Sequence, residues 1–318
     1  MQQFHQQFHR MNIQTISLVI SDILRSATPL ILAALGELVT EKSGVLNLGV
    51  EGMMLVGAVA GFITASVTTN IYLGLLIALF SGIAIALIHA LLVITITANQ
   101  VATGLALSIF GSGLSAFVGA GYVGKTITKL QPINIPVLKS IPVIGEAVFK
   151  QDFVVYASVV LVILVWWFLR KTRAGLVLQS IGESPEAADA LGLPVNRVRY
   201  LAVMFGGAMA GLAGGYLSLA YTPLWTENMT AGRGWIAIAL VVFATWKPER
   251  ILLGAYLFGG VSALQLILQG LGVNISPYLL SSLPYLATIL VLVFISRNNK
   301  PIQLDAPASL GQPFRPTH

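Results

Sequence analysis

The chain has 318 residues, of which 56% are apolar and only 9% are charged, and its formal net charge is +6. Soluble domains usually contain about 25% charged residues, so this composition excludes a soluble protein and predicts one embedded in a membrane. The sequence has no cysteine, which excludes disulfides and thiolate metal sites. Its apolar stretches are continuous and do not alternate with polar residues, which favours helices over a β-barrel.

We expect an all-α, polytopic membrane bundle with about eight to ten spans and at least one interrupted helix, in one transmembrane domain over residues 16–296. Residues 1–15 form a polar leader, and no cleavage site of small residues follows the first apolar run, so a removed signal peptide is not expected. His5 and His9 in this leader have no carboxylate cluster beside them and do not predict a metal site. The expected spans are 16–39, 45–68, 71–96, 100–121, 153–169, 200–222, 234–247, 250–270 and 278–296.

Two of these spans are irregular. In 16–39, Asp22 and Arg25 interrupt the apolar run and Pro29 follows them. One clean crossing and an interfacial helix with a half-span both fit that pattern, so the side of the N-terminus stays open. The segment 234–247 is short for a crossing, about 21 Å at 1.5 Å per residue, so a half-helix is a second interpretation.

A polar, glycine-rich stretch, GELVTEKSGVLNLGVEGMMLVGA, covers residues 36–58. A charge at the centre of a membrane helix costs roughly 2.5–3.5 kcal/mol on insertion scales, so Glu37 and Glu51 are expected to face a cavity or a partner. Glycines let a helix break and let another helix approach closely. The stretch therefore predicts an interrupted helix beside a translocation path, whereas Glu41 and Lys42 are interpreted as part of a cytoplasmic turn.

Other polar side chains extend the candidate path. Asn99 and Gln100 mark a tight turn at the start of a span, and Gln265 and Gln269 share a helix face at spacing i, i+4. His89, alone within a span, is interpreted as a buried histidine with its hydrogen bonds satisfied. The candidate path residues are Glu37, Asn47, Glu51, Asn99, Gln100, Gln265 and Gln269.

Residues 119–126 match the phosphate-loop pattern G-x-x-x-x-G-K-[ST]. In phosphate loops the pattern lies between a strand and a helix, so that backbone amides surround the phosphates. Here a predicted membrane helix precedes the match and a loop containing prolines follows it, so we reject a nucleotide site. We expect no cofactor, no metal and no catalytic centre in this chain.

The loop RKTRAGLVLQSIGESPEAADALGLPVNRVRY, residues 170–200, carries five Lys or Arg residues, which predicts a cytoplasmic position. Ser184 is a suitable N-cap, Pro185 suits the first helical position, and Glu186 complements the helix dipole. Gly192 then supplies a left-handed C-terminal stop. The loop therefore contains a short helix with both ends encoded, and such a helix on the face of a membrane protein predicts a partner.

The turn at 247–250 and the tail at 297–318 are also basic, so we expect them on the cytoplasmic side with 170–200. The loops 122–152 and 223–233 are expected outside, although the lysines of the first oppose that assignment. The tail contains several prolines and no apolar run, and is predicted to be disordered. The expected location is a bacterial cytoplasmic membrane, with the C-terminus inside.

The span 200–222 carries glycines four residues apart at Gly207, Gly211 and Gly215. This small-xxx-small spacing permits close helix packing. We expect that packing within the subunit, and a subunit interface is the alternative.

Three stretches resemble the permease subunits of ATP-binding-cassette importers of the ribose-type and branched-chain amino-acid permease family. They are EKSGVLNLGVEGMMLVGA (41–58), IGESPEAADALGL (181–193) and AGRGWIAIALVVFATWKPE (231–249). The form NLGVEGMM is most similar to the branch for nucleoside or simple-sugar uptake. The resemblance implies that the second stretch is the coupling helix that contacts the ATPase, and it assigns that role to Glu183, Ser184, Pro185, Glu186, Ala187, Ala188, Asp189 and Gly192.

The resemblance implies the membrane-spanning subunit of an importer for a small polar solute, with a nucleoside expected first and a simple sugar next. The implied partners are an ATPase subunit, a second permease of the same or a different kind, and an extracytoplasmic binding lipoprotein; no nucleic acid is expected. The residues leave two alternatives. Glu37, Glu51 and His89 fit an ion-gradient-driven secondary transporter, and the glycine-rich faces fit a membrane scaffold that transports nothing.

Overall fold

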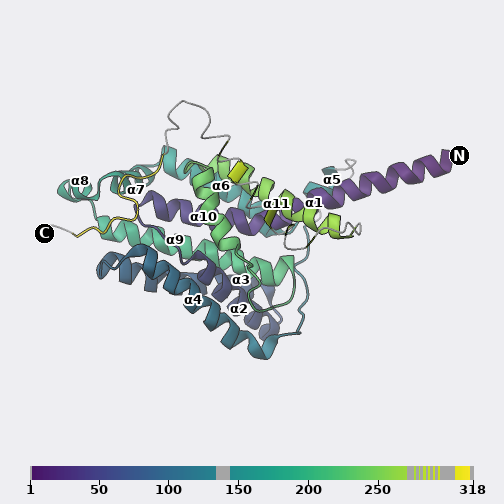
Figure 1. Ribbon diagram of the computed structural model, residues 1–318, viewed down its shortest axis with the longest axis horizontal. Coiled ribbons are helices and arrows are strands. Elements are labelled where there is room, and N and C mark those ends of the chain that lie inside the picture. Colours follow the sequence, from purple (N-terminus) through teal and green to yellow (C-terminus); the bar gives the residue numbers. More distant parts are fainter. Residues whose placement is uncertain are drawn as a thin grey trace.

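The computed structural model describes the backbone of residues 2–133, 144–270 and 305–315, with single positions between 276 and 293, and side chains from residue 16 onward except at 144, 146 and 265–270. This part of the chain is almost entirely helical (Figure 1). The helices are α1 (Gln2–Lys42), α2 (Val50–Thr68), α3 (Ile71–Ala90), α4 (Gln100–Gly119), α5 (Ile144–Phe149), α6 (Phe153–Lys171), α7 (Arg173–Glu183), α8 (Pro185–Ala190), α9 (Val195–Tyr216), α10 (Arg233–Phe243) and α11 (Pro248–Gly270). Short segments prolong three of them, namely η1 (Leu91–Thr95), η2 (Ala120–Tyr122) and η3 (Leu217–Tyr221).

Six helical segments of the described chain are long and apolar enough to cross a membrane. They are Ile16–Lys42, Val50–Thr68, Ile71–Thr95, Gln100–Tyr122, Phe153–Lys171 and Val195–Tyr221. These segments confirm the predicted all-α, polytopic class. The expected span at 278–296 lies largely outside the described residues, so the total of about eight to ten stays a prediction.

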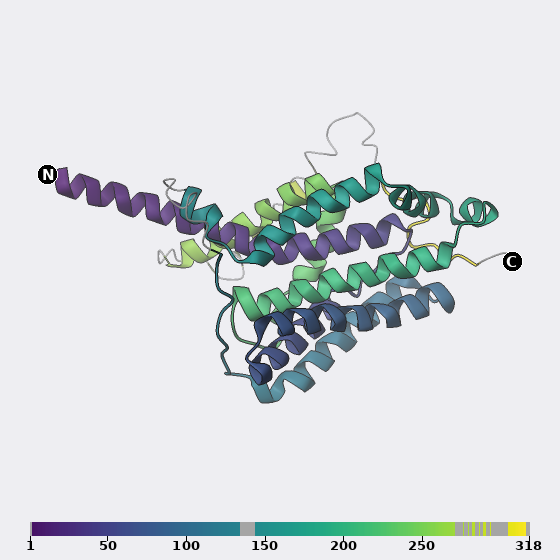
Figure 2. The same cartoon turned by 180° about the vertical axis from the view of Figure 1, so that it is seen from behind.

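Helix α9 lies in the middle of the bundle, packed against α1, α2 and α3 (Figures 1 and 2). Its glycines make this contact possible. A Cβ atom on Gly211 would meet the backbone oxygen of Ala78 in α3, and one on Gly82 would meet the backbone oxygen of Gly207. The glycine face predicted from spacing is therefore used within the subunit, where it brings two backbones into direct contact.

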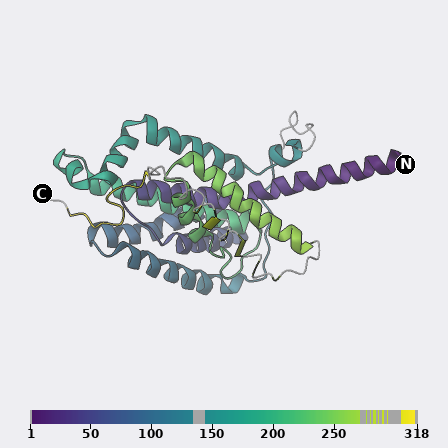
Figure 3. The ribbon, with the colours of Figure 1, turned by 45° about the horizontal axis from the view of Figure 1, so that its top comes forward.

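The two ends of the bundle carry different segments. We call the end with α7, α8 and residues 305–315 the α8 end, and the opposite end the loop end (Figure 3). At the α8 end, Arg170 pairs with Glu249 at 2.7 Å and Lys247 pairs with Asp305 at 3.4 Å. At the loop end, a backbone bridge joins Thr126 to Leu224. The segments predicted to share one side of the membrane therefore do share one end.

Helix α1 is continuous over 41 residues, and Pro29 lies inside it without ending it. The stretch 16–42 is thus one crossing, which removes the alternative of an interfacial helix followed by a half-span. The backbone of the polar leader, from Gln2 onward, forms the first turns of this helix, which project beyond the bundle (Figure 2).

The predicted interruption is present. Helix α1 ends at Lys42 and α2 begins at Val50, and residues 45–47 between them belong to no helix, strand or turn. Helix α10 has only 11 residues, about 16 Å of length, so it covers half a bilayer, as the short span at 234–247 suggested. The structure thus contains a non-helical segment between α1 and α2 and one short apolar helix, α10, and Glu51 at the start of α2 bonds to the start of α10.

Residues 305–315 correct the expectation of a disordered tail. Ser309 and Phe314 are 6% and 4% exposed, although the surrounding sequence has no apolar run. Hydrogen bonds to the ends of other helices hold these residues in place, for example the bond from the Ser309 N–H to the Gly182 carbonyl at 3.0 Å. Residues 297–304 and 316–318 lie outside the described part of the chain.

Candidate functional site

The short helix α8 forms as the sequence predicted. The Ser184 hydroxyl accepts a hydrogen bond from the Ala187 N–H at 3.3 Å, and Pro185 occupies the first helical position. At the other end, Gly192 has a φ of +78°, and the Leu193 N–H donates to the Ala188 carbonyl at 3.0 Å. Both caps are closed by residues within five positions of the helix, so α8 can hold its shape on an exposed loop.

Helix α8 has a buried face and an exposed face. Pro185 and Ala188 point into the protein, and Ala188 packs with Ile181 of α7 and Val195 of α9. The exposed positions of the α8 loop are Glu183, Glu186, Ala187, Ala190, Leu191 and Gly192. Leu191 stands out because this large apolar side chain is 81% exposed on a polar loop. Leu191 lies outside the membrane-crossing segments, so its side chain is available to a binding partner.

The sequence reading missed the helix that supports α8. Helix α7 precedes it directly, and the Thr172 hydroxyl caps α7 by accepting from the Gly175 N–H at 3.0 Å. Its buried positions, Gly175, Leu178, Ile181 and Gly182, follow a helical period. The helical period of these residues and Thr172 as a cap are the sequence signals that indicate α7.

The break between α1 and α2 is buried, and its backbone groups are satisfied by side chains. Glu37 accepts from the Asn47 N–H at 3.0 Å, and Gln100 accepts from the Leu46 N–H at 2.7 Å. Ser108 donates to the Leu48 carbonyl at 2.7 Å. Unwound backbone inside an apolar bundle needs such partners, because each unsatisfied group costs free energy.

These bonds also give the depth of the break. Leu48, two residues before α2, is bonded to Ser108, which lies eight residues, about 12 Å, beyond Gln100 at the start of α4. Helix α2 therefore starts well inside the bundle. His89 is buried and donates from Nε2 to the Leu46 carbonyl at 3.2 Å, but its Nδ1 has no partner among the described residues, so the interpretation as a histidine with all its hydrogen bonds satisfied holds for one ring nitrogen only.

Glu51 joins the start of α2 to the start of α10. Its Oε1 accepts from the Thr230 hydroxyl at 2.6 Å and from the Gly232 N–H at 2.9 Å, and its Oε2 accepts from the Gly234 N–H at 2.6 Å. A carboxylate at a helix N-terminus is stabilised by the free amides and by the helix dipole. Glu51 is thus the acidic cap of the half-helix.

Glu41 and Lys42 differ from the cytoplasmic turn predicted for them. Both lie in the last turn of α1, and they are 1% and 8% exposed. The indole N–H of Trp246 donates to Glu41, and the Lys42 ammonium donates to the Asp305 carbonyl at 2.6 Å. Their partners come from positions more than 200 residues away, which no local pattern indicates.

A hollow of about 530 Å³ opens beside Glu51, between α2, α4 and α10. Its lining combines polar and aromatic side chains, among them Ser112, Asn228 and Trp235. Trp235 is 37% exposed and Asn228 is exposed, so both are available to a bound molecule. A hollow with a few polar groups beside an aromatic ring suits a small polar molecule with a flat face.

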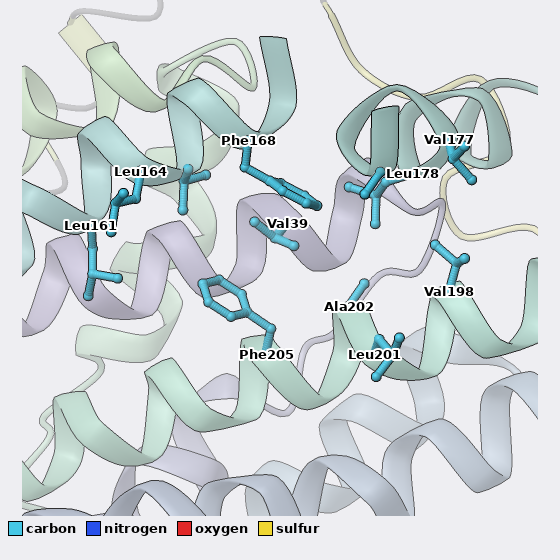
Figure 4. A pocket seen from close by; sticks show the side chains of 12 residues that line it. Val39, Leu161, Leu164, Phe168, Val177, Leu178, Val198, Leu201, Ala202 and Phe205 are labelled. Atoms are coloured by element: carbon cyan, nitrogen blue, oxygen red, sulfur yellow. The ribbon is translucent and has the colours of Figure 1, made fainter. Parts of the chain in front are cut away.

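A second cavity, an apolar groove of about 560 Å³, lies between α1, α6, α7 and α9 (Figure 4). Phe168 of α6 and Phe205 of α9 point into it, and every side chain that lines it is apolar. A sugar or a nucleoside would lose its hydrogen bonds to water there without replacement. The groove therefore belongs to the apolar exterior and not to a route for a polar solute.

The structure separates the candidate path residues into groups. Glu37, Asn47 and Gln100 meet at the break, where they are at most 3% exposed, and Glu51 lies at α10. Asn99 is exposed at the α8 end and caps α4 by accepting from the Ala102 N–H at 2.9 Å. The side chains of Gln265 and Gln269 in α11 are outside the described part of the chain.

Comparison with known proteins places this geometry in a family. Over 92% of its length the chain is 43% identical to the provisionally named glucose ABC transporter permease protein TsgC13 of Haloferax volcanii, of which 95% is covered. It is 35% identical to the guanosine ABC transporter permease protein NupQ of Bacillus subtilis, over 95% of the chain and 98% of the relative. It is 30% identical to the nucleoside ABC transporter permease protein NupC of Lactococcus lactis, over 88% and 92%.

The profile of one family, described as branched-chain amino acid transport system / permease component, matches residues 19–295. That range contains the six membrane-crossing segments almost completely, together with α7, α8 and the break. The chain therefore belongs to this permease family and is a multi-pass membrane protein.

Proposed function

We propose that this chain is the membrane-spanning subunit of an ATP-binding-cassette importer that carries a nucleoside or, as the second choice, a simple sugar across the cytoplasmic membrane. The observation that carries the proposal is α8, a capped helix that is rooted in the bundle and presents Leu191 and acidic residues to the outside. Permeases of this family work with an ATPase and a solute-binding protein, and a projecting helix is what an ATPase can push.

In this proposal the α8 end faces the cytoplasm, and so does the C-terminus. The concentration of Arg and Lys in the loop 170–200 supports that orientation. The contact with the ATPase is formed by the exposed face of the α8 loop, which consists of Glu183, Glu186, Ala187, Ala190, Leu191 and Gly192. Ser184, Pro185 and Ala188 hold this surface in place, and Asp189 lies between the two sets.

The solute passes along the face formed by α2, α4 and α10. The hollow beside Glu51 supports this route, because Trp235 offers a surface on which a base or a sugar ring can stack, and Asn228 and Ser112 offer hydrogen bonds. A second permease subunit covers this face. Ile109 of α4, at the rim of the hollow, is 75% exposed and is therefore accessible to that subunit. Glu37, Asn47 and Gln100 act behind this face by holding the break.

The test is uptake by the purified permease, ATPase and binding protein in proteoliposomes, with radiolabelled guanosine or glucose. We expect uptake that needs ATP and the binding protein, and unlabelled nucleosides should compete better than sugars. A complex in which residues 185–190 are replaced by a flexible linker should assemble its membrane part and take up nothing. Normal uptake by that variant would reject the coupling role of α8.

The same vesicles distinguish the alternative mechanism. A secondary transporter would move solute when this permease is present alone, with a proton or sodium gradient and no ATP. Uptake under those conditions would overturn the proposal in favour of the alternative. If the permease alone is inactive and the complete complex takes up solute with ATP, the secondary-transporter alternative is rejected.

A further inference from the structure

Residues 305–315, which we call the strap, cross the α8 end of the protein. At one end of the strap the Asp305 carbonyl accepts from the Lys42 ammonium at 2.6 Å, and at the other end Arg315 donates to the Thr97 hydroxyl at 3.2 Å. The strap runs past α7 and α9 on the way to the C-terminus (Figures 1 and 2). It therefore reaches from the end of α1 to the turn before α4.

The first anchor of the strap is Phe314, which is 4% exposed. Its ring packs into one small cluster with Ile181 of α7, Ala188 of α8 and Val195 of α9. The Arg199 guanidinium lies 5.6 Å from the centre of the same ring. The inner face of α8 therefore rests partly on a side chain of the strap.

The second anchor is Ser309. Its N–H and its hydroxyl both donate to the carbonyl of Gly182, at 3.0 and 2.7 Å. Arg199 donates from Nη2 to the Ser309 hydroxyl at 3.3 Å and from Nε to the Ser43 carbonyl at 3.1 Å. One buried guanidinium thus connects the strap to the first residue of the break.

Two further bonds reach the break from the strap. The Gly311 N–H donates to the Gly44 carbonyl at 3.2 Å. Gln100 donates from its amide nitrogen to the Gln312 carbonyl at 3.3 Å, while its amide oxygen accepts from the Leu46 N–H at 2.7 Å. The strap is therefore bonded directly to Gly44 and, through Gln100, to Leu46.

We propose that the strap connects α8 to the break, with Phe314 and Ser309 as positioning residues for transport. A push on α8 moves the cluster around Phe314, and the bonds at Gly311 and Gln312 carry that displacement to residues 43–46. This inference rests on the coupling role proposed for α8. Packed and hydrogen-bonded segments without slack transmit displacement in this way, whereas a free tail would not.

The proposal predicts uncoupling, which a purely structural role would not produce. In proteoliposomes with the complete complex, solute uptake and ATP hydrolysis are measured in the same sample. Phe314→Ala and Ser309→Ala should keep ATP hydrolysis and lower the solute carried per ATP by about fivefold or more for Phe314→Ala, and by less for Ser309→Ala. Phe314→Leu, which keeps an apolar side chain in the cluster, should restore most of the ratio.

The matched control for Ser309→Ala is Ser180→Ala. Its side chain is exposed on α7 and donates only to the Val177 carbonyl of its own helix at 2.8 Å, so the ratio should stay at the wild-type value. An unchanged ratio in Phe314→Ala, or an equal loss of uptake and hydrolysis, would overturn the role of the strap. If Phe314→Ala fails to assemble, the ratio in Ser309→Ala decides. A wild-type complex without ATP-driven uptake would instead count against the proposed function.

A second readout needs no transport. Because the chain has no cysteine, Ala190→Cys in α8 and Val101→Cys in α4, both at exposed positions, give a unique pair for spin labels. In the assembled complex we expect a narrow distance distribution that shifts on ATP binding. Phe314→Ala should broaden it and reduce the shift. The same distribution and the same shift in both proteins would reject the strap as the connection.

Discussion

Helix α8 and the break between α1 and α2 lie close together in the protein but are stabilised in opposite ways. The caps of α8 come from its own neighbours, Ser184 and Gly192, and half of its surface faces solvent. The break is buried, and its amides and carbonyls bond to Glu37, Gln100 and Ser108. The ends of α8 are thus capped locally and its outer face is free to meet a partner, whereas the backbone of the break finds its hydrogen-bond partners only in the folded bundle.

The largest effect is expected at Leu191, where a substitution should lower uptake without lowering the stability of the permease. Leu191→Asp places a charge on the exposed surface of the α8 loop, and losing a central apolar contact with a partner costs about 2 kcal/mol or more, so uptake should fall by about 30-fold. The melting temperature of the isolated permease should not change, because the side chain is 81% exposed. Ala308→Asp, at an exposed position of the strap, adds the same charge at the same end and should keep uptake. A fall in melting temperature that matches the loss of uptake would contradict the distinction.

Glu51 should show the opposite behaviour. Glu51→Ala leaves the Thr230 hydroxyl and the N–H groups of Gly232 and Gly234 without their acceptor, and we expect a loss of about 3 kcal/mol of stability, since bonds to a charged group are the stronger ones. Glu51→Gln keeps one amide oxygen as acceptor and should lose less. Thermal unfolding in detergent, followed by tryptophan fluorescence, measures both. Equal losses in the two variants would show that the packing of the Glu51 side chain, and not the hydrogen bonds that it accepts, determines its contribution to stability.

Two adjacent residues at the start of α4, Asn99 and Gln100, allow an exposed cap to be compared with a buried bond to the break. Gln100→Ala should cost about 1–3 kcal/mol, because the buried Leu46 N–H loses its partner. Asn99→Ala removes only an exposed helix cap, so its cost should be about 1 kcal/mol or less. Chemical denaturation in detergent gives both free energies of unfolding. A larger loss at Asn99 would mean that the break is not held by Gln100.

The smallest effect is expected at Ser184. Ser184→Ala removes the hydroxyl that accepts from the Ala187 N–H, which should cost α8 about 1 kcal/mol locally and raise hydrogen exchange there by about fivefold. The melting temperature of the permease should stay the same, because α8 is not part of the membrane core. Ser180→Ala, on the exposed side of α7, is the control. Unchanged exchange in Ser184→Ala would show that α8 depends on its packing alone.

The sequence predicted the features that depend on neighbouring residues. Runs of about 20 apolar residues indicated the membrane helices, and the α8 caps followed from Ser184, Pro185 and Gly192. The interruption within 36–58 was indicated because charges and glycines occurred together inside an apolar region. Helix α7 could also be predicted from the sequence, because its buried residues recur with a helical period.

Contacts between distant segments were decided only by the tertiary structure. No local pattern joins Glu41 to Trp246, or Glu51 to the start of α10, across about 180 to 200 residues. The strap is the clearest case, because its composition predicts disorder when it is considered alone. It is ordered since α7, α9 and α4 present carbonyls, an amide and a guanidinium in positions that only the folded bundle brings together. The sequence by itself thus determined the helices and their ends. The packing of the bundle decided which buried polar groups met, because a buried polar group needs a hydrogen-bond partner and that partner can come from a distant part of the chain.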